Sequence, residues 1–135
     1  MTEAARRNIA GGSPWEPKFG YSRAVRVGPW VLVAGTTGSD GAGKAVGAAS
    51  DAYAQSKHAL DKIEAALTEA GASMAQVVRT RIFVTRIADF EAVARAHAER
   101  FGTIRPASTL VEVKALVAPE LVVEIEADAY IGEGA

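Results

Sequence analysis

Three carboxylates alternate with small or apolar residues near the C-terminal end of the chain. Glu124, Glu126 and Asp128 are each separated by one residue. On a β-strand alternate side chains share a face, so the carboxylates would form one row with neighbours about 7 Å apart. A hydrophobic core does not require such a row. Either this face of the strand is solvated, or cations and hydrogen-bond donors face it.

The row allows two interpretations. In the functional one, Glu124 is a general base, or positions water, in a partly closed cleft that raises its pKa. In the structural one, Glu124 belongs to a strip of ion pairs with Arg79 or Arg81, which share one face of the strand predicted over residues 77–85. The residues alone leave both interpretations open.

The composition excludes several classes of protein. The 135 residues include no cysteine, which rules out disulfides, thiol nucleophiles and thiolate metal sites. The two histidines, His58 and His97, fall in different predicted helices and have no metal-binding spacing, so we expect no metal. With a net charge of −1, the chain lacks the positive field that nucleic-acid binding needs, so we do not expect nucleic acid as a partner.

The length and hydropathy predict one soluble, cytoplasmic domain. A chain of 135 residues can bury a core of its own. No apolar run approaches the length of a membrane span, so we expect no membrane partner. The domain is taken as residues 1–135, with residues 1–6 as a disordered lead.

Two helices are predicted from apolar residues at helical spacing. Ser50 or Asp51 can cap a helix that runs to about residue 70 and ends at Gly71. Its charged residues, Lys62 among them, are expected on a solvated surface. The second helix covers residues 87–101 and ends at Gly102. Its buried side is predicted to contain Phe90, Val93, Ala94, His97 and Phe101.

Alternating patterns predict the strands. They cover residues 7–10, 24–27, 30–36, 77–85, 106–113 and 121–131. A short turn is expected between the last two strands, and Val78, Thr80, Ile82 and Val84 are expected on one face. Residues 14–21 hold too much proline and glycine for a regular element. Two helices backing a mixed sheet of about six strands make a two-layer α+β fold, whose bare face predicts self-association.

Several segments resemble the RidA family, the YjgF-type reactive intermediate deaminases that are also described as endoribonuclease L-PSP-like. The similarity covers residues 7–131, including Tyr21 and Val-Ala-Gly-Thr at 33–36. Its most specific part is Arg-Pro-Ala-Ser-Thr-Leu-Val-Glu-Val at 105–113, followed by Glu-Ile-Glu-Ala at 124–127. The resemblance implies a chorismate-mutase-like fold and a homotrimer with small-molecule clefts between subunits. It also implies hydrolysis of imines or enamines, such as 2-aminoacrylate, without a cofactor.

The resemblance also implies roles for single residues. Glu124 matches the glutamate that holds the attacking water, Tyr21 matches an aromatic hydroxyl of the cleft, and Gly35 matches a glycine whose backbone borders the ligand. The deaminase pattern places an arginine after Pro-Ala to clamp the substrate carboxylate, but this chain has Ser108 there. A serine supplies neither the charge nor the fork of a guanidinium. Ser108 and Thr109 would therefore bind polar substrate atoms, and the substrate would differ from 2-aminoacrylate.

Three arginines, Arg23, Arg81 and Arg105, are candidates to replace the missing clamp. The leading hypothesis is a deaminase-type hydrolase that acts on a small imine, an enamine or a related reactive metabolite. The alternative is a trimer that binds a small metabolite or a protein partner without catalysis. Older family descriptions also include ribonuclease and translation inhibitor, which the near-neutral charge disfavours.

Overall fold

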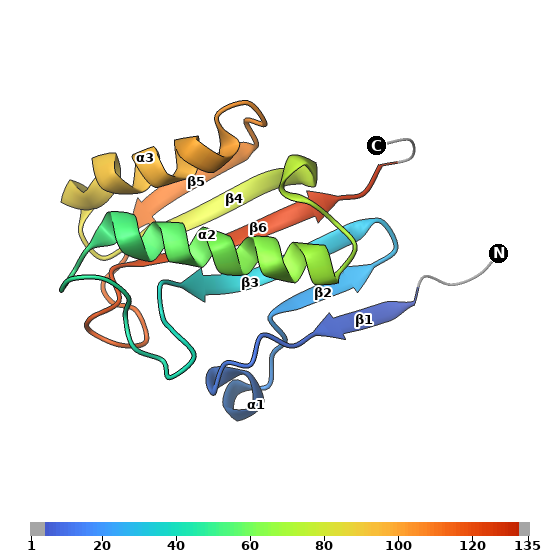
Figure 1. Ribbon diagram of the computed structural model, residues 1–135, viewed down its shortest axis with the longest axis horizontal. Helices are drawn as coiled ribbons and strands as arrows, with labels where there is room; N and C mark the ends of the chain where they lie inside the picture. The colour runs from blue at the N-terminus through green and yellow to red at the C-terminus, as the bar shows by residue number, and fades with distance from the viewer. Residues whose placement is uncertain (1–4, 133–135) are drawn as a thin grey trace.

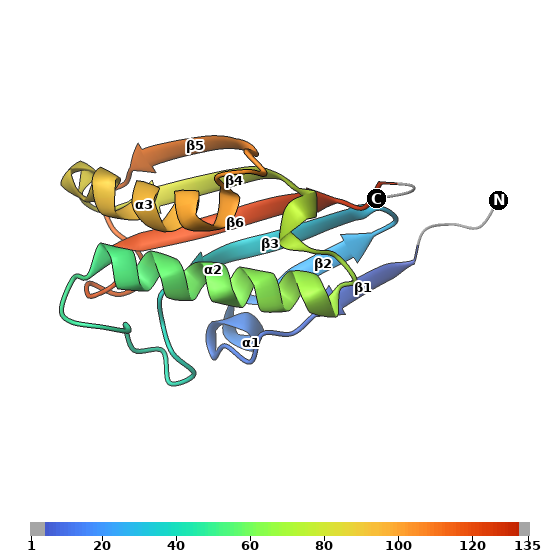
Figure 2. The ribbon, with the colours of Figure 1, turned by 45° about the horizontal axis from the view of Figure 1, so that its top comes forward.

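The computed structural model describes residues 5–132, which form a six-stranded sheet with helices on one face (Figure 1). The strands are β1 (Arg6–Ile9), β2 (Ala24–Val27), β3 (Trp30–Thr37), β4 (Val77–Val84), β5 (Ala107–Glu112) and β6 (Val123–Tyr130). The helices are α1 (Trp15–Phe19), α2 (Ala52–Glu69) and α3 (Phe90–Phe101), with short 3₁₀ turns η1 (Met74–Gln76) and η2 (Ile87–Asp89). Helices α2 and α3 lie side by side on the sheet (Figure 2). The predicted two-layer α+β architecture with a mixed sheet is confirmed.

The core lies between α2, α3 and the sheet. Leu60, Ile63 and Leu67 follow one another at helical spacing on α2 and are completely buried. They belong to the same buried cluster as Val123 and Ile125 of β6. Burial of each such side chain stabilises the fold by about 1.5–3 kcal/mol. Because every second residue of β6 enters this core, the intervening carboxylates are held on the opposite face of the sheet, as predicted.

Helix α2 begins and ends where the sequence indicates. The Asp51 side chain accepts a hydrogen bond from the Ala54 amide at 2.9 Å, which caps the N-terminus. Gly71 follows the helix with φ of +88°, a conformation that glycine adopts without strain. Ser73 and Gln76 form a capping box at the start of η1. These local signals define the two ends of α2 and the turn that follows it.

The predicted short turn between the last two strands is wrong. The sheet order is β1-β2-β3-β6-β4-β5, so β4 lies between β5 and β6. Strand β5 pairs in parallel with β4, and α3 makes the crossover between them. Strand β6 is antiparallel to both β3 and β4. Local sequence patterns do not specify which strands pair, because pairing depends on long-range contacts.

Other predictions require smaller corrections. Residues 15–19 form α1, ended by Gly20 with φ of +89°, where an irregular loop was predicted. Contrary to the prediction, Val78 does not share the buried face of Thr80, Ile82 and Val84 but is exposed, because a bulge interrupts the pairing of β4 with β6 between Val77 and Arg79. Arg6 belongs to β1, while residues 1–4 of the predicted lead lie outside the described residues.

The start of the second helix also differs from the prediction. Residues 87–89 form the 3₁₀ turn η2, and α3 starts at Phe90, whose side chain is exposed instead of buried. Val93, Ala96 and Phe101 form its buried side. Among residues 5–132, no helix is long and apolar enough to cross a membrane.

Gly38→Ala is expected to lower the free energy of unfolding by about 1–3 kcal/mol, because small-to-large changes strain a packed interface. A Cβ at this position would lie 2.4 Å from the Gln55 Cα atom and 2.6 Å from the Gln55 carbonyl oxygen of α2. Urea denaturation measures the change. Gly41→Ala is the control, since its Cβ would meet no atom within 4 Å. Equal stability of the two variants would contradict close packing of β3 on α2.

Candidate functional site

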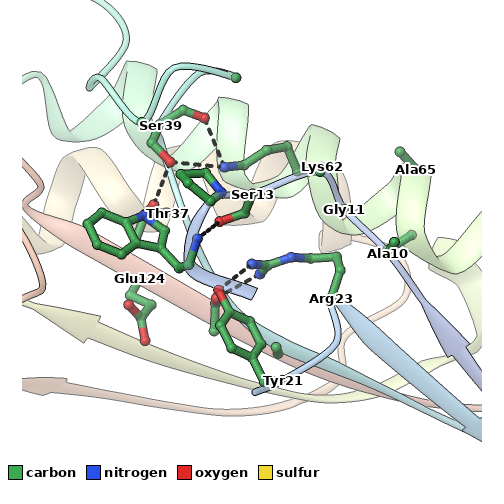
Figure 3. A pocket seen from close by; sticks show the side chains of 18 of the residues that line it. Ala10, Gly11, Ser13, Tyr21, Arg23, Thr37, Ser39, Lys62, Ala65 and Glu124 are labelled. Carbon is green, nitrogen blue, oxygen red and sulfur yellow. Dashed lines mark hydrogen bonds between the residues drawn. The ribbon is translucent and has the colours of Figure 1, made fainter. Parts of the chain in front are cut away.

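A pocket of about 1010 Å³ opens at the C-terminal end of β3. Its walls come from segments far apart in the sequence: residues 10–15, Tyr21, the end of β3, the loop at 39–43, α2 and β6 (Figure 3). Three of the site residues predicted from the sequence, Tyr21, Gly35 and Glu124, line it together. The other two, Ser108 and Thr109, are not among its lining residues.

Glu124 differs from the other carboxylates of its row. Arg81 of β4 contacts Glu126 at 3.0 Å and Asp128 at 3.4 Å, so these two form the ion-pair strip that the structural interpretation predicts. Within the described residues, Glu124 has no salt bridge and no side-chain hydrogen bond. The row therefore consists of a paired part and one carboxylate that is open to a ligand.

The environment of Glu124 favours its protonated form. Burial raises the pKa of this carboxyl, the nearby Glu126 raises it further, and Arg23 acts in the opposite direction. A half-buried carboxylate with a raised pKa and an unused acceptor is the kind of group that accepts a proton from water. The geometry thus supports the functional interpretation for Glu124 and the structural one for its neighbours.

Because Gly35 has no side chain, the Glu124 carboxylate can occupy the space beside it. The register between β3 and β6 shifts between Val33 and Thr36, and Gly35 lies within this irregularity. A Cβ atom on Gly35 would overlap the Glu124 side chain, because it would lie only 2.3 Å from the Glu124 Oε2 atom. Only glycine therefore permits this carboxylate to lie against the backbone of β3.

Arg23 connects the segments that surround Glu124. Its Nη1 donates hydrogen bonds to the Gly35 carbonyl and the Thr36 hydroxyl, both at 2.8 Å, and its Nη2 donates to the Tyr21 hydroxyl at 3.0 Å. The Nε atom lies 3.9 Å from the buried Glu16 carboxylate. Because Arg23 is itself 9% exposed, it acts as an internal brace of the pocket. Among the three arginine candidates for the missing clamp, only Arg23 lines the pocket.

Arg81 and Arg105 do not occupy the pocket. Arg81 is engaged by the carboxylates of β6, and Arg105 is exposed, with φ of +57°, in the turn before β5. The sequence could not rank the three arginines, because pattern alone does not show which of them is enclosed.

Lys62, which was predicted to lie on the solvated surface, is a pocket residue. Its Nζ donates hydrogen bonds to the Ser39 carbonyl at 2.9 Å and to the Ser39 hydroxyl at 3.3 Å. Burial lowers the pKa of Lys62 to about 8, and the charge of Arg23 contributes in the same direction. His58, one turn earlier on α2, also lines the pocket. The surface assignment is therefore wrong for Lys62, because the loop after β3 folds over this side of α2.

Ser108 and Thr109 lie on the exposed edge strand β5. The Ser108 hydroxyl accepts a hydrogen bond from the Thr80 hydroxyl at 2.7 Å, and Thr80 is also bonded to His97 Nε2 at 2.9 Å. Thr109 is in register with Arg81.

Burial lowers the pKa of His97, which packs against Phe101 at the helix–sheet contact, as its predicted packing role requires.

No metal-binding cluster is present in the part of the chain that the structure describes, where groups of three or more His, Asp or Glu side chains do not converge. The polar groups of the pocket include the open Glu124 carboxylate, the Tyr21 hydroxyl, the Arg23 guanidinium and the Lys62 amine, and the lining also contains His58, Asp40, Glu69 and Glu126. Such a set can bind a small polar molecule and transfer protons to or from it.

Comparisons with known proteins agree with the fold. The family model described as Endoribonuclease L-PSP matches residues 13–131. An uncharacterized protein of Streptomyces coelicolor is 39% identical over 132 residues, which cover 98% of this chain and 97% of that protein. A crystal structure from Mycobacterium tuberculosis, of a YjgF/YER057c/UK114 family member, is 53% identical with a TM-score of 0.85, covering 94% of this chain and 100% of the other. The 3-aminoacrylate deaminase RutC of Acinetobacter baylyi is 38% identical over 81 residues, 60% of this chain and 64% of that protein.

Proposed function

The chain belongs to the Endoribonuclease L-PSP family, which includes the YjgF and RidA proteins, and on this premise we propose that it hydrolyses small imines or enamines. The products would be a carbonyl compound and ammonia. The observation that carries the proposal is the open Glu124 carboxylate, which is half-buried in the pocket beside Gly35 and has a raised pKa. The relative named as a 3-aminoacrylate deaminase supports the same class of reaction.

In the proposed mechanism Glu124 accepts a proton from water as the water oxygen attacks the imine carbon. The electron pair of the C=N bond moves to nitrogen, to which Glu124 passes this proton, and a carbinolamine results. Glu124 then accepts the proton of the carbinolamine hydroxyl as the C=O bond forms, and returns it to the nitrogen, which leaves as ammonia when the C–N bond breaks. An enamine enters the same sequence after protonation of its β-carbon. No cofactor takes part in this sequence.

Tyr21 is suited to bind the substrate. Its hydroxyl oxygen accepts a hydrogen bond from Arg23, so its own proton remains available for a polar atom of the ligand. The ring makes an edge-to-face contact with Phe19, with the ring centroids 5.8 Å apart. Both contacts restrict the side chain, and we assign Tyr21 to substrate positioning rather than to proton abstraction.

The proposal includes assembly into a homotrimer with the pockets at subunit boundaries. Ser108 and Thr109 are exposed on β5, which forms one edge of the sheet, and from there would reach the pocket of a neighbouring subunit. Sedimentation equilibrium at micromolar concentration tests this arrangement. A monomeric mass would limit the site to the residues of one chain.

Keto-acid and ammonia formation from imines generated in situ by an amino-acid oxidase tests the proposed activity. The wild-type rate is expected to exceed spontaneous hydrolysis, and the most favoured substrate is expected to be larger than 2-aminoacrylate. If no imine is consumed while the same compounds raise the Tm, the protein is a binding protein instead.

Gly35→Ala is expected to reduce imine turnover by about tenfold to a hundredfold, because a displacement of the reacting group by about 1 Å costs that much. The Cβ would displace the flexible end of Glu124 and leave the backbone conformation allowed, so the Tm should change little. Steady-state kinetics and thermal denaturation measure the two effects. Full activity in Gly35→Ala would show that the observed position of Glu124 is not the reactive one.

A further inference from the structure

The pocket holds two cations besides the groups used in the proposed hydrolysis. Lys62 reaches it from α2, and Arg23 from the residue that precedes β2 (Figure 3). In the described part of the chain, Lys62 forms no salt bridge, and both of its hydrogen bonds go to Ser39. An ammonium group has three protons, so one remains free for a ligand.

Arg23 also retains hydrogen-bonding capacity. Of the two protons on Nη2, one is donated to Tyr21 and the other has no acceptor among residues 5–132. Its nearest carboxylate, Glu16, already accepts hydrogen bonds from the Gly11 and Ser13 amides at 2.9 Å and 3.0 Å. The positive charge of Arg23 is therefore only partly compensated.

The two cations are close enough to influence each other. After burial, the charge of Arg23 is the next cause that lowers the pKa of Lys62, and the Asp40 carboxylate opposes it to a smaller extent. Asp40 is exposed and accepts hydrogen bonds from the Ala42 and Lys44 amides. Two neighbouring cations without a shared counter-ion would gain attraction from an anion placed between them.

Apolar surface adjoins these cations. The lining includes the rings of Pro14, Trp15 and Phe19 together with Val117, and the Phe19 and Val117 side chains are 84% and 60% exposed. A ligand with an anionic head and an apolar body matches this combination. Asp40, Glu69, Glu124 and Glu126 line the same pocket, and within residues 5–132 only Glu126 among them is paired with an arginine, Arg81, so they disfavour a doubly charged head such as a phosphate.

We propose that Lys62, together with Arg23, binds the carboxylate of an apolar substrate and so supplies the cation that Ser108 lacks. The inference rests on the proposed function for the identity of the substrate, but the binding site itself can be tested without turnover. Figure 3 shows Lys62 and Glu124 well apart, so a substrate would have to extend from the cations to the carboxylate. The substrate is then an apolar imino or enamino acid longer than a three-carbon acid.

Calorimetric titration with 3-phenylpropanoate and its uncharged amide, 3-phenylpropanamide, tests this subsite. At pH 7.5 the wild type is expected to bind the acid at least tenfold more tightly than the amide. Lys62→Met should abolish the preference. Lys57→Met is the matched control, because Lys57 is exposed on the same helix outside the pocket and its loss should leave the preference unchanged.

The pH dependence provides a second readout. The wild-type preference for the acid should decline as the pH rises through about 8, where Lys62 loses its proton. Lys62→Arg should keep the preference at pH 9.5, because a guanidinium stays charged. The other charged or titratable groups that line the pocket are His58 of α2, Arg23, Asp40, Glu69, Glu124 and Glu126. The titration is therefore repeated in His58→Gln and Asp40→Asn. A pH dependence that disappears in either of these variants would overturn the assignment to Lys62.

Three further results would overturn the subsite. They are equal binding of acid and amide by the wild type, an undiminished preference in Lys62→Met, and tighter binding of 3-phenylpropylphosphonate than of the carboxylate. Failure of the proposed hydrolysis can be distinguished from failure of the subsite. If the wild type binds the acid as expected but consumes no imine, the carboxylate subsite stands without the reaction. If neutral imines are hydrolysed without any preference for acids, the reaction stands without the subsite.

Discussion

Glu124→Gln is expected to lower kcat for imine hydrolysis by about 10²–10⁴-fold, the usual contribution of a general base. The amide has nearly the same shape but cannot accept the proton of the attacking water. Within the described residues Glu124 has no ion pair that the substitution would break, so the fold should be retained. The same oxidase-coupled ammonia assay measures the loss.

Asp128→Asn is the matched control for this substitution. Asp128 lies on the same face of β6, but it pairs with Arg81 and does not line the pocket. Its turnover should stay within about twofold of the wild type, since a partly exposed ion pair contributes little to stability. Wild-type turnover in Glu124→Gln would sink the proposed mechanism, whereas equal losses in both variants would indicate a general disturbance of β6.

The raised pKa of Glu124 has consequences of definite sign. The deprotonated form is the active one, so kcat/KM of the wild type should rise with pH through a midpoint above the ordinary value for glutamate.

For stability, a carboxyl whose pKa is higher in the folded state favours folding at low pH. That contribution is lost as the pH rises through the folded-state pKa. Glu124→Gln should therefore be more stable than the wild type at pH 7, and the difference should vanish below the unfolded-state pKa.

Arg23→Met is expected to reduce the free energy of unfolding by about 3–5 kcal/mol, the range observed when one partner of a buried charged network is removed. It leaves the Gly35 carbonyl and the Thr36 hydroxyl without their donor and deprives Glu16 of its nearby cation. Imine turnover should fall as well, because the Tyr21 hydroxyl and the Gly35 carbonyl are no longer held by hydrogen bonds from one guanidinium. Urea denaturation and the ammonia assay measure the two effects.

Arg100→Met is the appropriate comparison for Arg23→Met. Arg100 pairs with Asp61 and Glu64 across α2 and α3, and both carboxylates are more than half exposed. Its loss should cost about 1 kcal/mol or less, as for other surface pairs. Similar costs for the two arginines would argue against Arg23 as an internal brace of the pocket.

The sequence by itself determined most of the helices and strands, and it pointed to three residues that line the pocket. Helix α2, its caps and the alternation along β6 depend on residues that are close in the chain, so periodicity and capping chemistry identify them. Gly35 and Tyr21 entered through family resemblance and lie with Glu124 in the pocket. The short helix α1 escaped prediction because its Glu16 side chain accepts hydrogen bonds from the backbone amides of Gly11 and Ser13, which stabilise the preceding loop.

Only the tertiary structure decided which charges take part in the pocket. Arg81 lies in register with Glu126 because β4 inserts between β5 and β6, and this pairing separates Glu124 from the other carboxylates of its row. Lys62 has the sequence context of a surface lysine, yet the loop after β3 folds over it and bonds it through Ser39. Burial and charge proximity depend on contacts between distant segments, and local periodicity carries no information about these contacts.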